Sequence, residues 1–146
     1  MYIVDNFING AANTVSDDSS LIIDPSYGKD IGKVLYATTD SADLAIESAK
    51  QAFENWSLTG LSYRAELILK FRQGIIDRSN EIIGICTTEA GKTKPDAEAE
   101  LDRAIQALTN ASAVQHFYPS HLSPNVAGGI DIADRRYPIG VIAGVG

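Results

Sequence analysis

The chain has 146 residues, and its 45% hydrophobic and 21% charged content is ordinary for a single globular domain. Nineteen acidic against twelve basic side chains give a formal net charge of -7, and the basic residues are scattered, so nucleic acid is not an expected partner. No apolar run approaches the roughly 20 residues of a membrane-spanning helix, and the N-terminus lacks a signal-peptide pattern. One cysteine and two histidines exclude a disulfide framework and a zinc cluster. We expect a cytoplasmic protein that does not bind membranes.

The first 37 residues predict a small antiparallel β unit. Residues 2–8 have strand character and lead into Asn9-Gly10, a dipeptide that favours a hairpin turn because both residues tolerate positive φ. The apolar run 21–23 ends in a turn cluster at 24–28, and residues 31–37 alternate loosely as a further strand. The chain therefore begins with strands joined by short turns.

Residues 40–116 predict three to four helices. Asp40 is expected to cap the first helix, because a carboxylate there can accept hydrogen bonds from the unpaired amides of the first turn. The apolar side chains of this helix recur at helical spacing and end at Trp56, which predicts a stripe that packs against a core. A second helix is expected from Ser62 to about Ile76.

Two further helices follow. Asn80 is expected to cap the third, which should end at Gly91 because glycine commonly takes the left-handed conformation that closes a helix. Thr93 supplies a cap and Pro95 a first-turn proline for the fourth helix, which is expected to continue to about Gln115. These four helices would form one packed cluster.

The end of the chain predicts a loop followed by two strands. Residues 117–127 contain two prolines and are expected to form the loop. Within the strand region 128–146, residues 130–137 begin with the alternation of a strand that has two unlike faces, and Pro138 interrupts the run. Residues 139–145 are nearly uncharged, which suits a strand buried on both faces.

Several short motifs, in their order and spacing, resemble the N-terminal region of the aldehyde dehydrogenase superfamily. They are Phe7-Ile8-Asn9-Gly10, Asp24-Pro25 followed by Gly28, Ile31-Gly32-Lys33-Val34, Ala45 to Phe53 with Trp56, Arg64, Glu89-Ala90-Gly91-Lys92-Thr93 and Pro138-Ile139-Gly140-Val141. A second set is most similar to the acylating methylmalonate-semialdehyde dehydrogenases. It comprises Lys70-Phe71-Arg72, Gly91-Lys92-Thr93 with Asp96-Ala97, His121-Leu122, Gly129-Ile130-Asp131 and Gly140-Val141-Ile142-Ala143-Gly144.

This resemblance implies an α+β fold in which residues 1–146 form one N-terminal segment of an enzyme about three times as long. Its parts would be a β unit over 1–37, helices over 40–116, and terminal strands over 128–146 that serve oligomerisation and lead into the nucleotide domain. The parent would oxidise a small semialdehyde with NAD and coenzyme A by way of a cysteine thiolate. The chain departs from the family pattern at Gly144-Val145-Gly146.

By the same resemblance, the catalytic cysteine, the glutamate base and the adenosine-binding part lie beyond this chain. We therefore assign no catalytic, cofactor-binding or metal residue, and we expect the chain alone to be inactive and to bind NAD and CoA poorly. A homo-oligomer formed through strand edges is expected. The alternatives are a non-catalytic interaction module, a segment of a succinate-semialdehyde or betaine-aldehyde type of dehydrogenase, and a small independent enzyme.

Five residues are candidates for a catalytic role. Cys86 lies on the apolar face of its helix without a basic neighbour to lower its pKa, which favours a core role. Glu89 and Lys92 flank a helix end, where structural contacts are the simpler interpretation. His116 and His121 flank a loop without carboxylate or cysteine companions, so we expect them to be surface or loop residues.

Two further patterns could suggest binding. Gly140, Gly144 and Gly146 have the wrong spacing for a dinucleotide loop and no helix after them, so we expect them to permit close packing in a strand. An acidic run lies on a helix whose opposite face is apolar, and a solvated face explains it. The run consists of Asp96, Glu98, Glu100 and Asp102.

Overall fold

The computed structural model describes residues 1–13, 18–117 and 119–145, and it has the α+β character that the sequence predicts. Small sheets come first along the chain, helices follow, and a β-hairpin precedes a C-terminal segment without regular structure. The order of these elements therefore follows the prediction, while several of their boundaries and pairings differ from it.

The N-terminal part forms a three-stranded mixed sheet and a separate hairpin. The strands are β1 (Tyr2–Val4), β2 (Asn6–Ile8), β3 (Ala11–Asn13), β4 (Ser19–Asp24) and β5 (Lys29–Leu35). The sheet order is β1-β5-β4, with β4 antiparallel and β1 parallel to β5, and β2 pairs with β3. Asn9 and Gly10 have φ values of 52° and 79°, which confirms the predicted turn.

The prediction of a purely antiparallel unit is wrong because residues 2–8 form two strands. The backbone N–H of Asn6 donates to the Asp5 carboxylate at 2.7 Å, a local bond that competes with ladder pairing. The chain changes partners at this point, so β1 joins β5 in parallel while β2 turns back onto β3. The local turn was predictable, whereas the parallel pair joins residues about 30 positions apart.

The first two helices are α1 (Thr39–Trp56) and α2 (Leu61–Asp77). Thr38 caps α1 in place of the predicted Asp40. The Thr38 side chain accepts from the Ser41 amide at 3.2 Å, and the Ser41 hydroxyl accepts from the Thr38 amide at 2.8 Å. This reciprocal capping box satisfies two donors at once. Helix α2 begins one residue before the predicted start.

The remaining helices are α3 (Ser79–Ala90), α4 (Lys94–Ser112) and the short α5 (Val114–Phe117). The predicted cap at Asn80 is wrong, because α3 begins earlier, with Arg78 in the cap position and paired to Glu81 at 2.7 Å. The left-handed Gly91 at the end of α3, with φ 61°, and the cap at Thr93 confirm two predictions. Helix α4 ends at Ser112, before the predicted end.

The predicted loop over 117–127 is also wrong in its second half. Leu122–Ala127 forms β6, which pairs antiparallel with β7 (Ile130–Ala133) around a Gly128-Gly129 turn. Asn125 has φ 52°, and its backbone N–H donates to the Asp131 carboxylate at 2.8 Å. The pairing register of β6 with β7 shifts at this point. Pro124 is tolerated because a two-stranded hairpin has only edge strands. Strand β7 is shorter than the predicted 130–137, and residues 134–145 contain no strand.

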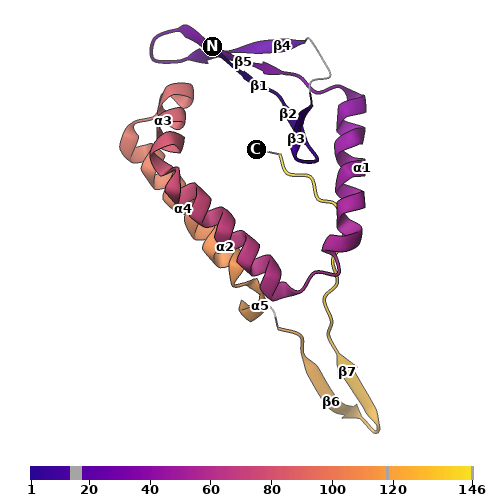
Figure 1. Ribbon diagram of the computed structural model, residues 1–146. Coiled ribbons are helices and arrows are strands. Elements are labelled where there is room, and N and C mark those ends of the chain that lie inside the picture. Colours follow the sequence, from indigo (N-terminus) through magenta and orange to yellow (C-terminus); the bar gives the residue numbers. More distant parts are fainter. Residues whose placement is uncertain (14–17, 118, 146) are drawn as a thin grey trace.

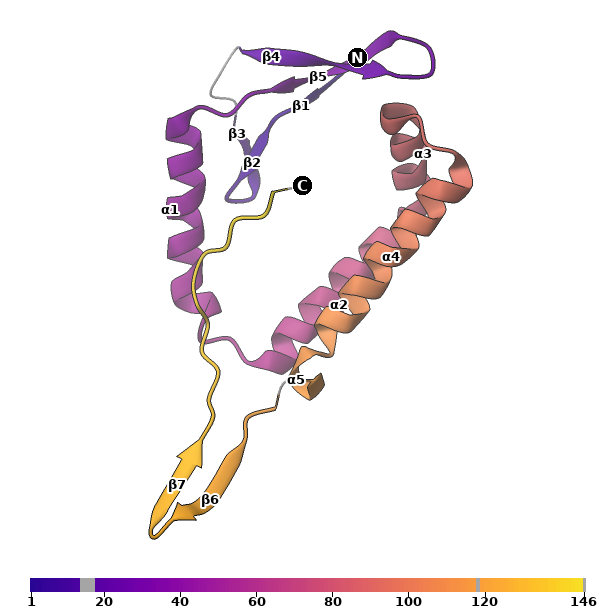
Figure 2. The same cartoon turned by 180° about the vertical axis from the view of Figure 1, so that it is seen from behind.

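The helices lie in two groups on opposite sides of the molecule (Figure 1). Helices α2 and α4 lie side by side, α3 continues beneath the β1-β5-β4 sheet, and α1 stands apart on the opposite side. The β6–β7 hairpin projects from the end remote from the sheet, and the last residues return along α1 (Figure 2). Within the described residues, no helix is both long and apolar enough to cross a membrane.

The interior of this structure is small. Of the described hydrophobic residues only Ala97 and Ile83 are buried, at 1% and 9% exposure. The accessible surface is 10926 Å², whereas a compact monomer of this length exposes about 7300 Å². The chain therefore leaves apolar faces open that a compact domain would cover.

Candidate functional site

A shallow apolar groove, here called the α1 groove, lies between α1 and the C-terminal segment. Its lining residues are uncharged: Ala49, Ala52, Phe53, Trp56, Gly140, Val141 and Ile142. The α1 stripe was predicted to face a core, yet Ile46 and Trp56 on that helix remain 46% and 43% exposed. The C-terminal segment covers only part of the stripe, so an apolar surface stays open beside it.

The segment 139–145 is itself largely uncovered. Ile139, Ile142 and Val145 are 89%, 75% and 100% exposed. Among the described residues, no backbone hydrogen bond joins 138–145 to the rest of the chain. The predicted buried strand is therefore wrong for this chain, because a strand needs a neighbour for its ladder and no described strand lies beside it. The residue pattern suits a strand, but none of the described strands pairs with this segment.

Arg64 fixes the corner between α1 and α2 at one end of the groove. One guanidinium nitrogen, Nη2, donates to the carbonyl oxygens of Trp56 and Ser57 at 3.0 and 3.1 Å. The guanidinium carbon lies 5.4 Å from the centroid of the Trp56 ring, a cation–π contact worth about 0.5–1 kcal/mol at such a site. Arg64 therefore provides hydrogen-bond donors for carbonyl oxygens at the C-terminal end of α1, and it also packs against the Trp56 indole.

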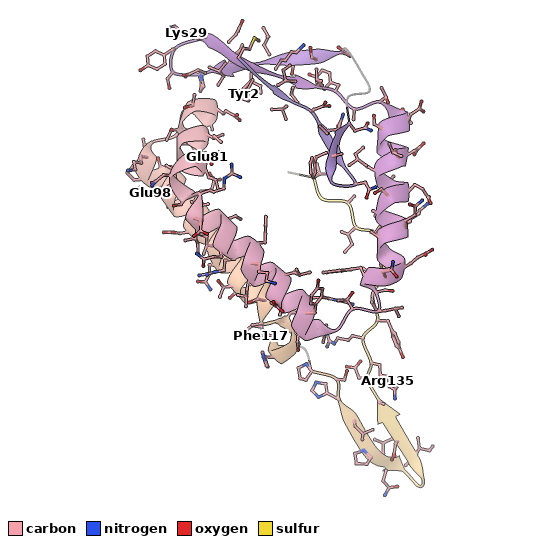
Figure 3. All side chains as sticks on the ribbon, viewed as in Figure 1. Tyr2, Lys29, Glu81, Glu98, Phe117 and Arg135 are labelled. Atoms are coloured by element: carbon pink, nitrogen blue, oxygen red, sulfur yellow. The ribbon has the colours of Figure 1, made fainter. Side chains whose placement is uncertain are left out.

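A second groove lies where the β1-β5-β4 sheet meets α3. Its lining residues are Tyr2, Glu81, Gly84, Ile85, Thr88 and Glu89, and Figure 3 shows Tyr2 and Glu81 on its two sides. The Tyr2 hydroxyl donates to the Glu89 carboxylate, and this hydrogen bond, with burial and the nearby charge, raises the pKa of Tyr2 to about 12. The contact joins the sheet to α3.

The candidate nucleophile and the histidines lie in different parts of the molecule. Cys86 is half-buried on α3, close to the sheet end of the structure. His116 lies in α5, and His121 lines a groove at the base of the β6–β7 hairpin with Asp134, Arg135 and Arg136. Helix α3 and the hairpin occupy opposite ends of the molecule (Figure 1). The structure therefore does not bring the cysteine and the histidines together.

The charged residues near the start of α4 make local structural contacts. Lys92 pairs with Glu100, which lowers the pKa of the Glu100 carboxyl, and Lys94 lies 3.6 Å from Glu98. The Thr93 hydroxyl donates to the Asp96 carboxylate at 2.6 Å within the helix cap. Asp102 is exposed on the same helix. The solvated, lysine-paired face agrees with the prediction, and no group of three or more potential metal ligands occurs in the described part of the chain.

The glycines of the C-terminal segment do not have the role that was predicted for them. A Cβ at Gly140 or Gly144 would meet no atom within 4 Å, so neither permits a close approach, and both lie outside any strand. Gly140 instead has φ 113°, a conformation that side chains disfavour, and it shapes the segment where it meets α1. Gly146 lies outside the described residues.

Three features of these surfaces were not found from the sequence. The Tyr2–Glu89 bond joins residues 87 positions apart, and the Arg64 contacts depend on the angle between two helices, so neither leaves a local signal. The β6–β7 hairpin did leave one, because the dipeptide Gly128-Gly129 between apolar residues favours a two-residue turn. The two prolines outweighed that signal in the prediction.

The sheet, the helical cluster and the projecting hairpin together form the N-terminal part of the aldehyde dehydrogenase fold. The model of the aldehyde dehydrogenase family matches residues 13–146, which is most of the chain. The chain belongs to the aldehyde dehydrogenase family.

Its relatives include dehydrogenases of small semialdehydes. A malonate-semialdehyde dehydrogenase of Bacillus cytotoxicus is 34% identical over 143 residues, which are 97% of this chain and 29% of that protein. A crystal structure assigned as a methylmalonate-semialdehyde dehydrogenase of Sinorhizobium meliloti, complexed with NAD, has a TM-score of 0.90 and 31% identity, and the match covers 96% of this chain and 29% of that one. The chain thus spans about 29% of the length of the curated relatives it matches.

A more distant structure shows how far the fold alone extends. Lactaldehyde dehydrogenase of Escherichia coli is 22% identical to this chain with a TM-score of 0.82, and the match covers 90% of this chain and 28% of that one. At this identity the likeness concerns the fold, because one fold serves enzymes with different substrates.

Proposed function

We propose that the chain is the N-terminal part of an NAD-dependent aldehyde dehydrogenase that converts malonate or methylmalonate semialdehyde to an acyl-CoA. The observation that carries this proposal is the match along 96% of the chain, at TM-score 0.90, to a structure assigned as a methylmalonate-semialdehyde dehydrogenase in complex with NAD. The Bacillus relatives named as malonate-semialdehyde dehydrogenases support the same substrate class. A soluble, cytoplasmic enzyme is part of this proposal.

We further propose that the chain by itself does not catalyse the oxidation. An aldehyde dehydrogenation of this kind needs a thiolate to attack the carbonyl carbon and an acceptor for the hydride, and NAD supplies the acceptor when it is bound. The single cysteine, Cys86, is half-buried on α3 without a histidine on that helix. In this view the described residues shape and support the enzyme, and the reacting groups come from the part that the chain does not span.

A second proposed role is assembly through the β6–β7 hairpin. Every residue of both strands is exposed, including the apolar residues Val126, Ile130 and Ile132. A projecting hairpin with open edges and apolar side chains is a template for pairing with another sheet. We expect homo-oligomers through these edges, and light scattering after size exclusion is the test. A clean monomer at high concentration would contradict this role.

The test of the catalytic proposal compares two proteins, the 146-residue chain and the product of the whole reading frame that contains it. The whole product should reduce NAD when given CoA and malonate or methylmalonate semialdehyde, and the chain alone should show no turnover. Succinate semialdehyde and betaine aldehyde serve as competing substrates. Turnover by the purified chain would contradict its inactivity, and a preference for either competing substrate would contradict the substrate class.

A further inference from the structure

We propose that Asn9 is a modification site, at which the side-chain amide is converted to a carboxylate through a succinimide formed with the backbone nitrogen of Gly10. Water is the only co-reactant that this conversion needs. The proposal goes beyond the proposed function and does not rest on it, because it concerns the turn between β2 and β3 and no substrate of the enzyme.

The turn brings the two reacting groups together in an open place. Of the asparagines in the chain, only Asn9 is followed by glycine. Ring closure requires the nitrogen of the next residue to approach the side-chain carbonyl carbon, and a Cβ on that residue obstructs the approach. Asn9 and Gly10 connect the paired residues Ile8 and Ala11, and both are exposed. A Cβ added at Gly10 would meet no atom within 4 Å, so the turn is accessible to water.

Neither reacting group is held by a hydrogen bond. Within the described residues, the Asn9 side chain and the Gly10 N–H have no hydrogen-bond partner. Strands β2 and β3 have three residues each and form a sheet of their own, and a hairpin of this size is only marginally stable. Brief local opening therefore lets the Asn9 side chain rotate onto the backbone while the rest of the protein stays folded.

The reaction is a substitution at the side-chain carbonyl carbon, without oxidation or reduction. Hydroxide removes the proton of the Gly10 N–H, and the nitrogen attacks Cγ of Asn9, so that a C–N bond closes the succinimide ring. The Cγ–Nδ2 bond breaks, and the amide nitrogen takes a proton from water and leaves as ammonia. Water then adds to either ring carbonyl and opens the ring, which gives an aspartyl or an isoaspartyl residue.

The second hairpin provides a comparison within the same molecule. Asn125 has the same φ of 52° as Asn9 and is also exposed. Its Oδ1 accepts a hydrogen bond from the Gly129 N–H at 3.2 Å, and the next residue is the β-branched Val126. The side chain is therefore held away from the attack, and the following nitrogen is crowded. Asn125 should remain intact under conditions that convert Asn9.

The two products have different structural consequences. An aspartate in this position keeps the turn, because Asp-Gly is also a preferred turn dipeptide, and adds one negative charge. An isoaspartyl residue places the former Cβ in the main chain, so the turn gains a backbone atom and the pairing of Ile8 with Ala11 cannot be kept. Because β2 contacts α1, the isoaspartyl product should loosen the hairpin on the side of this helix.

The first test compares Asn9 with Asn125 in the unaltered protein. The product of the whole reading frame that contains this chain is incubated in its folded state at neutral and at alkaline pH, and its peptides are analysed by mass spectrometry. We expect the mass gain of an NH2-to-OH exchange at Asn9 about tenfold or more faster than at Asn125, because no side chain obstructs the glycine nitrogen. The rate should rise with pH, and an isoaspartyl methyltransferase should label the converted peptide. Equal rates at the two asparagines, or conversion of Asn9 only after unfolding in urea, would overturn the proposal.

Matched variants test the role of the glycine. Gly10→Ala should slow the conversion of Asn9 about tenfold or more, since its Cβ obstructs the attacking nitrogen. Gly129→Ala makes the same change in the other hairpin, at the same φ of 79° and with the same open surroundings, and should leave the conversion of Asn9 unchanged. Undiminished conversion in Gly10→Ala would overturn the proposed attack.

A third variant separates the added charge from the added backbone atom. Asn9→Asp supplies the charge alone, so amide hydrogen exchange in β2 and β3 should match that of the fresh protein. The isoaspartyl form, purified after incubation, should exchange about tenfold or more faster in both strands. Equal exchange in the isoaspartyl form and in Asn9→Asp would overturn the structural consequence.

Discussion

The helical cluster of α2, α3 and α4 and the arm formed by α1 with residues 139–145 have similar apolar stripes but differ in what covers them. In the cluster, Ile83 and Ala97 are buried, and Arg72 Nε donates to Thr109 Oγ1 at 2.8 Å, which ties α2 to α4. On the arm, Ile46, Trp56 and Ile142 stay substantially exposed. The same helical pattern thus leads to a packed interface in one region and an open face in the other.

This difference shows what an amphipathic pattern predicts. Apolar side chains at helical spacing indicate that a face gains free energy when it is covered, but they do not say which chain or segment covers it. The α1 helix owes its position to its cap, to Arg64 at its end and to contacts with β2. In the helical cluster, α3 and α4 bury Ile83 and Ala97, although Leu69, Phe71 and Ile85 on the same cluster stay exposed.

The largest expected effect compares one isoleucine from each region. Ile83→Ala removes three buried carbon atoms from the cluster and should lower the free energy of unfolding by about 2–4 kcal/mol. Ile142→Ala makes the same change on the open arm and should alter it by less than about 0.5 kcal/mol. Urea unfolding followed by circular dichroism measures both. Equal losses would show that the arm is already part of the packed core.

The next effect uses one glycine inside α3, Gly84, and the glycine that follows its last residue, Gly91. Gly91→Ala places a Cβ at φ 61° and only 2.8 Å from Pro25 Cγ, so the free energy of unfolding should fall by about 1–2 kcal/mol or more. Gly84 lies inside the helix, and a Cβ added there would meet no atom within 4 Å. Gly84→Ala should therefore raise the free energy of unfolding by about 0.5–1 kcal/mol. The same chemical change therefore has opposite signs at the two positions. A gain at Gly91 would mean that the contact with Pro25 does not hold α3 against the β4–β5 turn.

Much of the helical region could be predicted because its signals are local. Gly91 and Thr93 lie at helix ends, where short-range hydrogen bonds decide the structure, and both predictions are confirmed. The cap of α1 was missed by two residues because Asp40 and Thr38 are both acceptable caps, and only the reciprocal bond with Ser41 favours Thr38. The parallel pairing of β1 with β5 had no local signal, because it depends on how distant segments meet.

The irregular backbone of the open arm could not be predicted because its residue pattern is that of a strand. The uncharged run 139–145 suits a strand buried on both faces, and the resemblance placed the neighbours of that strand in a nucleotide domain that the chain does not span. Its residues are suited to burial, yet they are exposed here. The two grooves join residues from separate elements, such as Tyr2 with Glu89, so the motifs could identify the family but not these contacts.

A smaller effect is expected at the start of the arm. Thr38→Ala removes both the acceptor for the Ser41 amide and one partner of the Ser41 hydroxyl, at a cost of about 1 kcal/mol. Because α1 stands apart from the cluster, the loss should appear as faster amide hydrogen exchange in the first turns of α1, with little change in global unfolding. Thr93→Ala, at the cap of the packed α4, is the matched control and should lower global stability. The reverse pattern would contradict the separation of the two regions.

The smallest expected effect concerns the contact between the sheet and α3 and is visible only at high pH. Tyr2 has a pKa of about 12 in the folded chain against an ordinary value of about 10, because its hydroxyl donates to Glu89. Above pH 10 the unfolded chain releases this proton while the folded chain retains it, so the stabilisation is complete below pH 10 and is lost as the pH rises to about 12.

Tyr2→Phe should therefore flatten the decline in stability between pH 10 and pH 12, while Tyr137→Phe, an exposed tyrosine near the hairpin, should leave the decline unchanged. Denaturant midpoints across this range, with tyrosinate absorbance as a second measurement, check the prediction. Identical curves for the two variants would mean that Tyr2 and Glu89 are not joined in solution. The contact of Gly91 and Pro25 would then be the main described link between the end of α3 and the β4–β5 turn.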